Sequence, residues 1–228
     1  KVRQAIVYAV NNAGIAQKLM KGRATAGAQN SPQGYAGHNP ALTVRYDLNK
    51  AKQLMKEAGY EKGFEVSMIA PNNRYVNDEK IAEAAASMLG KIGIKVNLKT
   101  MPKAQYWDQF DLQVADIQMI GWHSDTEDTG NFFEFLLMCP NKETGYGQYN
   151  SGNYCNQEVD SLALQVQAET DEAKRKGMLQ KMEKIAYDEA AFVPLHWQDL
   201  SWAGKNNLDI APIVNVMNFP YFGDLVIK

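Results

Sequence analysis

Residues 64–99 read FEVSMIAPNNRYVNDEKIAEAAASMLGKIGIKVNLK. Residues 64–70 are typical of a strand, and residues 94–99 alternate apolar and polar side chains with the period of a half-buried strand. Between them apolar residues recur at helical spacing, after a possible cap at Asn77 or Asp78 and before a terminating Gly93. This strand–helix–strand order predicts a parallel crossover unit, and therefore an α/β fold.

The same patterns extend outward on both sides of this unit. They predict helices at 2–10, 47–58 and 103–110, helices capped by Asn156 and by Thr170 or Asp171, and strands at 116–122 and 192–197. Residues 22–45 are rich in Gly and Pro without a period, so we expect a long loop. The patterning fades after Gly204, which predicts one main core from residue 1 to about residue 200.

Composition excludes several classes of protein. Hydrophobic residues make up 45% and charged residues 22% of the 228 residues, which argues against disorder and coiled coil. A net charge of -2 gives no electrostatic footprint for nucleic acid or an anionic membrane. There is no apolar run of the roughly 18 residues that would span a bilayer. The chain opens inside a helical pattern without a signal-peptide pattern, so we expect it to be cut from a longer protein.

Two cysteines, Cys139 and Cys155, flank a stretch rich in Gly, Asn and Tyr, which indicates a loop. No C-x-x-C spacing or nearby histidine completes a metal site. Two interpretations remain open at this point. The cysteines are either unrelated buried thiols or a disulfide, which would stabilise the fold by roughly 3 kcal/mol and indicate an oxidising compartment.

The most promising candidate site follows the predicted strand at 116–122. Ligands of open α/β sheets bind beyond the carboxyl ends of strands, and here the sequence GWHSDTED places an aromatic ring, a histidine and acids at residues 121–128. Asp125 could pair with a ligand ammonium beside the wall of Trp122. Arg74 follows the strand at 64–70 and, if both strands are parallel, lies at the same sheet edge as Asp125. Arg74 could pair with a ligand carboxylate, so an acid and a base on neighbouring strand ends would suit a zwitterion.

Other interpretations of the same loop compete with ligand binding. A solvated acidic turn is the plainest, and for Arg74 the plainest is an exposed arginine. A calcium loop starting at Asp125 would need Glu where Leu136 stands. Ser124 is flanked by a histidine and an acid, but neighbouring residues of an extended loop point apart and do not converge as a catalytic triad. Asp125 and Asp128 could act as a carboxylate pair on glycosides.

Five segments, in order along the chain, resemble one known family. They read VRQAIVYAVN at 2–11, YDLNKAKQLM followed by AGY at 46–60, LGKIGIKV at 89–96, GWHSD followed by NFF at 121–133, and AAFVPLH at 190–196. The set resembles the extracytoplasmic solute-binding proteins of dipeptide and oligopeptide ABC importers, although no single motif would suffice.

This resemblance implies a lobe of a two-lobe periplasmic-binding-protein fold, with a mixed, mostly parallel sheet flanked by helices. It implies that residues 1–203 form the carboxyl-terminal ligand-binding lobe and that residues 204–228 cross back toward a missing amino-terminal lobe. Such proteins are not enzymes and need no cofactor. They capture small peptides between their lobes and deliver them to a permease, the expected contact with the membrane. The expected location is the periplasm, or the outer surface of a Gram-positive cell on a membrane tether.

The resemblance also implies roles for single residues. Asp125 would pair with the α-ammonium of the peptide, Trp122 would wall the pocket, and Arg74 is the candidate partner of the peptide carboxylate. His123 stands where a smaller residue often follows the tryptophan, so it could alter the choice of ligand. A loop disulfide at the spacing of the two cysteines also resembles dipeptide-binding members. Alternatives are a nickel chelate, haem or a sugar oligomer as ligand, a carboxylate hydrolase, or an adhesin or sensor of the same fold.

Overall fold

A computed structural model describes residues 1–215 and 217–228, and its central feature is a three-stranded parallel sheet. The strand order is β3-β2-β4, with β2 (Phe64–Pro71) paired in parallel with β3 (Ile94–Met101) and with β4 (Ile117–Gln118). Helix α4 (Asp78–Gly90) connects β2 to β3. The predicted parallel crossover and the α/β class are therefore confirmed.

The side chains of β2 alternate between two faces of this sheet. Met68 and Ala70 enter a large core with α1 (Val2–Ala9), α3 (Leu48–Glu57) and α4, whereas Ile69 packs with Tyr106 and Phe110 of α5 (Lys103–Asp111). Successive residues of a strand point to opposite faces, so one strand serves both layers. We call α1, α3, β2, α4, β3 and α5 the sheet half of the molecule.

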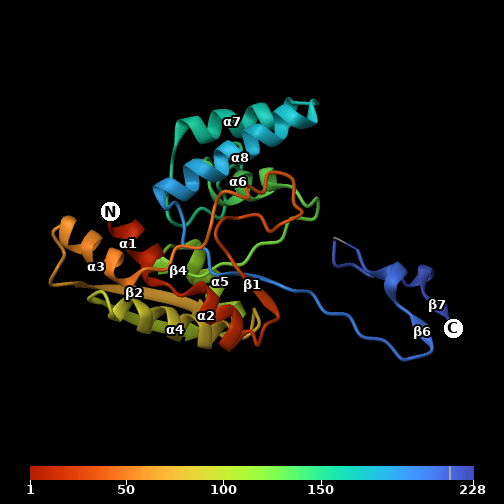
Figure 1. Cartoon of the computed structure of the whole chain (residues 1–228), viewed down its shortest axis with the longest axis horizontal. Coiled ribbons are helices and arrows are strands. Elements are labelled where there is room, and N and C mark those ends of the chain that lie inside the picture. The colour runs from red at the N-terminus through yellow and green to blue at the C-terminus, as the bar shows by residue number, and fades with distance from the viewer. Residues whose placement is uncertain (216) are drawn as a thin grey trace.

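Three further helices form the helical half, α6 (Thr129–Leu136), α7 (Gln157–Ala168) and α8 (Glu172–Glu189), which pack around a core of their own. Figure 1 shows these helices gathered on the opposite side of the molecule from β2, α3 and α4. The starts of α7 and α8 follow the predicted caps, because Asn156 accepts the backbone N–H groups of Glu158 and Val159, and Asp171 accepts that of Lys174. Cys139 and Cys155 form a disulfide ahead of α7, as the resemblance implies.

Several predictions of the patterning are wrong in detail. The strand expected at 116–122 pairs over only two residues, and the one expected at 192–197 is β5 (His196–Gln198). Its partner is β1 (Ala24–Ala26), an antiparallel strand inside the segment expected to be a loop. The apolar side chains also form separate clusters in the two halves instead of one main core. Short apolar runs do not reveal their pairing partners, so such errors are expected. A short helix, α2 (Asn12–Gly14), and a π-helical turn, Ile15–Leu19, were not predicted.

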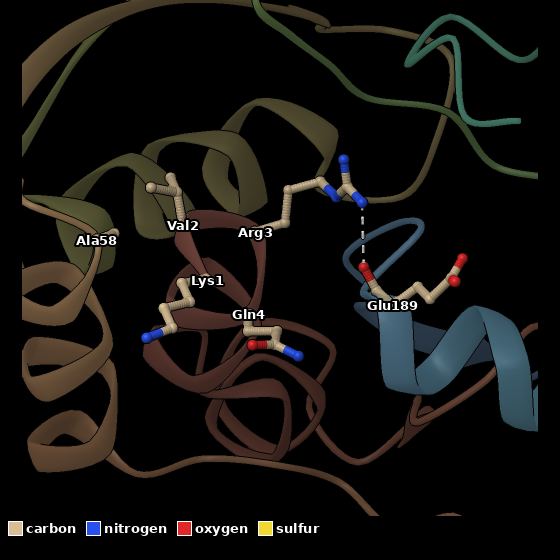
Figure 2. Close-up of a pocket in the computed structure, with 6 residues that line it drawn as sticks. All are labelled: Lys1, Val2, Arg3, Gln4, Ala58 and Glu189. Atoms are coloured by element: carbon tan, nitrogen blue, oxygen red, sulfur yellow. Dashed lines mark hydrogen bonds between the residues drawn. The ribbon is translucent and has the colours of Figure 1, made fainter.

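The two halves are joined where the start of α1 meets the end of α8. Arg3 donates from Nε to Ala190 O at 3.1 Å and from Nη2 to Glu189 O at 3.3 Å, as Figure 2 shows for the second bond. Gln4 donates to Asp188 O at 3.1 Å. These side chains satisfy carbonyl groups that a helix end leaves without intrahelical partners. A hollow of about 380 Å³ lies beside them, lined by Lys1, Val2, Arg3, Gln4, Ala58 and Glu189.

After β5 the chain runs away from both halves to a small hairpin of β6 (Leu208–Asp209) and β7 (Val226–Ile227) (Figure 1). Two 3-10 turns, Ala211–Ile213 and Phe222–Asp224, complete this tail. Its large apolar side chains are mostly exposed, including Phe219, Phe222 and Ile227 at 70–75%. Within the described residues, no helix is long and apolar enough to cross a membrane.

Candidate functional site

The candidate residues lie on two loops at one edge of the parallel sheet. β2 and β4 run in the same direction, so the loop that carries Arg74 and the loop that begins at Gly121 leave the sheet together. A tyrosine joins them, because Tyr75 Oη accepts the N–H of Gly121 at 2.9 Å and donates to its carbonyl at 3.4 Å. A methyl group on Gly121 would come within 2.8 Å of the Tyr75 ring, so glycine permits this close approach.

Arg74 is exposed, and its backbone is fixed more firmly than its side chain. Asp78 accepts the backbone N–H groups of Arg74 at 2.8 Å and of Tyr75 at 3.0 Å. The guanidinium carbon lies 4.8 Å from the centre of the Tyr75 ring, a cation–π contact. This contact places the charge beside the tyrosine that holds the second loop, with donors accessible to a ligand.

Trp122 is half-buried in an aromatic cluster. Its ring lies 5.3 Å from the ring of Phe135 and 5.1 Å from that of Tyr149, measured between centroids. Its Nε1 donates to Asn131 Oδ1 at 2.7 Å. The tryptophan ring is therefore held rigidly, with its one polar group already satisfied.

The acid and the histidine that follow Trp122 are close to each other. His123 Nε2 lies 3.4 Å from Asp125 Oδ1, with side-chain exposures of 42% and 63%. Tyr35, from a distant part of the sequence, faces the same loop. Burial raises the pKa of Tyr35, and the charges of Glu127 and Asp125 raise it further. The site thus presents an accessible carboxylate beside an imidazole and a neutral phenol.

Ser124 and Asp128 have structural roles instead. Ser124 is completely buried, and its hydroxyl donates to Asp128 O at 3.0 Å and accepts the Asp128 N–H at 3.2 Å. Asp128 caps α6 by accepting the N–H of Gly130 at 2.7 Å, and it forms an ion pair with Arg175. Neither group is available to act on a substrate, so the geometry does not favour the hydrolase interpretation.

Among the described residues, no group of three potential metal ligands lies in the loop at 121–128. In the part of the chain that the structure describes, one group of three potential ligands comes together, formed by Cys139, Cys155 and Asp160. The two sulfur atoms are bonded to each other, and Asp160 accepts the backbone N–H of Cys139 at 3.0 Å. This group stabilises the loop before α7.

Sequence reasoning missed Tyr35, Tyr75 and Asn131, which the structure brings to the site. The positions of Tyr75, beside Arg74, and of Asn131, at helical spacing from Phe135, could have drawn attention to them. Tyr35 lies in the predicted loop at 22–45 and gave no signal, because its approach to the acids depends on pairing of Ala36 with Asp128. A hollow of about 350 Å³ nearby, between α6 and the other two helices, includes Thr126 and Arg175 in its lining but not Trp122.

Residues 1–144 match the family described as bacterial extracellular solute-binding proteins, family 5 middle. The chain belongs to this family. It is 30% identical to the dipeptide-binding protein of Escherichia coli K12 over 83% of this chain and 36% of the relative. It is 31% identical to the haem-binding protein A of Haemophilus influenzae over 86% of this chain and 36% of that relative. The chain therefore spans a little over a third of the length of these family members.

Solved structures show the same fold. A dipeptide-binding protein from Pseudoalteromonas in complex with Met-Leu superposes with a TM-score of 0.83 at 25% identity, covering 100% of this chain and 45% of the other. The periplasmic binding protein DppA from Helicobacter pylori, in complex with the peptide STSA, gives 0.82 at 24% identity over 99% of this chain and 43% of that chain. These likenesses confirm the predicted periplasmic-binding-protein fold.

Proposed function

We propose that this chain is the ligand-binding lobe of a substrate-binding protein that captures small peptides for an ABC-importer permease. The observation that carries the proposal is the exposed carboxylate of Asp125 beside the fixed ring of Trp122, on a loop tied to that of Arg74. The carboxylate would pair with the peptide ammonium and the guanidinium with the peptide carboxylate. Membership of a solute-binding family and likeness to dipeptide-binding relatives support this assignment.

Residues 1–203 would form this lobe, and residues 204–228 would cross to an amino-terminal lobe of the same protein. The exposed apolar side chains of the tail and the longer relatives support this division. Closure of two lobes excludes water from a buried ion pair, which contributes to binding only when its hydrogen bonds are satisfied. One lobe alone should therefore bind peptide weakly or not at all.

The periplasm, or the outer surface of a Gram-positive cell, is the compartment we propose. The disulfide between Cys139 and Cys155 supports an oxidising location. The protein would meet the membrane only through the permease, and we assign it no catalytic activity.

Asp125→Asn in the full-length protein tests the ammonium pairing. Calorimetry should show affinity for free-amine dipeptides falling about a hundredfold, since a charge-assisted bond is lost inside a closed cleft. N-acetylated dipeptides should bind the variant and the parent equally. Asp188→Asn, which changes an exposed acid near the end of α8, is the control. Equal losses for free and acetylated peptides would overturn the assignment of Asp125.

Haem is the second candidate ligand, because the haem-binding relative is as similar as the dipeptide-binding one. His123 offers an imidazole that can ligate haem iron. A haem titration followed by visible absorption, with His123→Ala as the comparison, distinguishes haem from peptide as the ligand. Tight haem binding that depends on His123, without peptide binding, would replace the peptide assignment.

A further inference from the structure

Glu183, in the middle of α8, is a carboxyl group completely buried in the helical half. It accepts hydrogen bonds from Asn30 N and Nδ2, both at 3.2 Å, and from Ser31 N at 3.1 Å, and its Oε1 also lies 3.1 Å from Ser31 Oγ. Its neighbours on the helix, Leu179, Met182 and Ala186, are apolar and equally buried. Burying a carboxyl group destabilises the folded state unless its hydrogen bonds are satisfied. The number of protons available for these hydrogen bonds therefore decides whether the network is stable.

The contacts of Glu183 continue into a relay. Ser31 Oγ lies within hydrogen-bond distance of both Glu183 Oε1, at 3.1 Å, and Thr129 Oγ1. Thr129 Oγ1 in turn lies 2.5 Å from Ala36 O. Each of these three contacts needs one proton, and the two hydroxyl groups supply two. With an ionised carboxylate, one contact would therefore join two acceptors; a protonated Glu183 supplies the third proton.

The far end of this relay holds the candidate ligand loop. Thr129 is the first residue of α6, and its N–H donates to Ala36 O at 3.0 Å. Ala36 N–H donates to Glu127 O at 2.9 Å, two residues beyond Asp125. The packing is tight, because a methyl group on Gly37 would come within 2.5 Å of Thr129 Oγ1. A shift of Ser31 would thus be transmitted to the loop through Thr129 and Ala36.

We propose that Glu183 is a positioning residue, whose protonated carboxyl group acts through Ser31 and Thr129 to hold residues 124–129 in the orientation that presents Asp125. The Glu183 hydroxyl donates to Ser31 Oγ, the Ser31 hydroxyl to Thr129 Oγ1, and the Thr129 hydroxyl to Ala36 O. When the proton leaves, the Ser31 hydroxyl turns back to the carboxylate, and the Thr129 hydroxyl can supply a proton to only one of the two remaining contacts. The link to ligand binding rests on the function proposed above; the relay itself does not.

The electrostatics agree with this arrangement. Burial raises the pKa of Glu183 to about 7, against the opposing effect of its hydrogen bonds from Asn30 and Ser31. Other titratable groups border the relay: His38 Nδ1 lies 2.9 Å from Ser31 O, and the ion pair of Asp128 with Arg175 adjoins Thr129. The native state holds a proton that the unfolded chain releases at lower pH. Stability from this group is therefore complete at low pH and is lost as the pH rises through about 7.

Thr129→Val and Thr129→Ser test the relay as a matched pair in the full-length protein. Valine keeps the shape and removes the hydroxyl, whereas serine keeps the hydroxyl. We expect Thr129→Val to speed hydrogen exchange at the amides of Ala36 and Gly130 and to weaken free-amine dipeptide binding about fivefold, the equivalent of one hydrogen bond. Thr129→Ser should do neither. Val159→Ala, in the same core but outside the relay, should lower stability without changing exchange in this loop.

Glu183→Gln tests the proton. The amide can donate to Ser31 Oγ as the protonated acid does, although it no longer accepts from Ser31 N. From about pH 5 to about pH 8 the urea midpoint of the parent should fall relative to that of the variant. If the urea midpoints of the parent and of Glu183→Gln changed in parallel with pH, Glu183 would not be protonated in the native state. If Thr129→Val left hydrogen exchange at Ala36 and Gly130 unchanged, the relay would not position the loop. Failure of the parent to bind any free-amine peptide would instead overturn the proposed function, since the exchange and pH measurements need no ligand.

Discussion

Apolar side chains hold the sheet half together, whereas polar contacts between distant segments hold much of the helical half. In the sheet half, Ile81 of α4 and Ile94 of β3 are completely buried in one continuous core. The helical half has a smaller core, and it adds a disulfide, an ion pair and the buried carboxyl group of Glu183. A core follows from local hydrophobic patterning, but long-range polar contacts depend on the finished fold. The two halves should therefore respond differently to substitution.

The largest effect should come from the apolar core. Ile81→Ala removes a completely buried side chain between α4 and the sheet and should lower the free energy of unfolding by about 3–4 kcal/mol. Urea unfolding measures the total loss in the free energy of unfolding. Hydrogen exchange should show protection lost mainly at the amides of β2 and β3, with α7 and α8 retaining most of theirs. Greater loss in α7 and α8 would show that the halves do not have separate cores.

Loss of the disulfide should have the next largest effect on stability. Replacing both Cys139 and Cys155 by serine opens a loop closed across 16 positions and should cost roughly 3 kcal/mol. Exchange should accelerate in residues 139–155 and at the start of α7, not in β2. A reducing agent should destabilise the parent by a similar amount and leave the double variant unchanged. Equal destabilisation by reductant in both proteins would show that the disulfide is not responsible.

The contrast between the halves also explains what the sequence could predict. Local periodicity was enough to predict the strand–helix–strand unit at 64–99. The helices capped by Asn156 and Asp171 also begin where expected. The two-residue strand β4 and the β1–β5 pair were misjudged, because pairing of short segments is decided by partners far away in the chain. Helix α6 was not predicted at all, although Asp128 caps it.

The candidate site divides in the same way. Arg74, Trp122 and Asp125 could be selected from the sequence because they follow strands that share a sheet edge, and Tyr75 joins their loops. Glu183 was not selected, because a glutamate among the many charged residues of this helix is usually exposed, and its partners Asn30 and Ser31 lie far away in the sequence. Local chemistry is visible in a sequence, whereas a polar network between remote segments is not.

The smallest effect concerns the ion pair of Asp128 with Arg175, whose side chains are only 16% and 29% exposed. Asp128→Asn keeps a side-chain oxygen to accept the Gly130 N–H, since asparagine caps helices as well as aspartate does, and removes only the charge. We expect a loss of about 1 kcal/mol, above the median for exposed pairs because this pair is partly desolvated. A double-mutant cycle with Arg175→Gln isolates the coupling.

The exposed pair of Lys184 with Asp188, with side chains 53% and 52% exposed, provides the matched control. Its cycle should give a coupling near zero, because solvent screens the charges and ordering two long side chains costs entropy. Equal couplings in the two cycles would mean that burial adds nothing to the Asp128 pair. A larger coupling for Asp128 would instead establish that this acid anchors α6, which leaves Asp125 and Glu127 as the exposed acids of the loop.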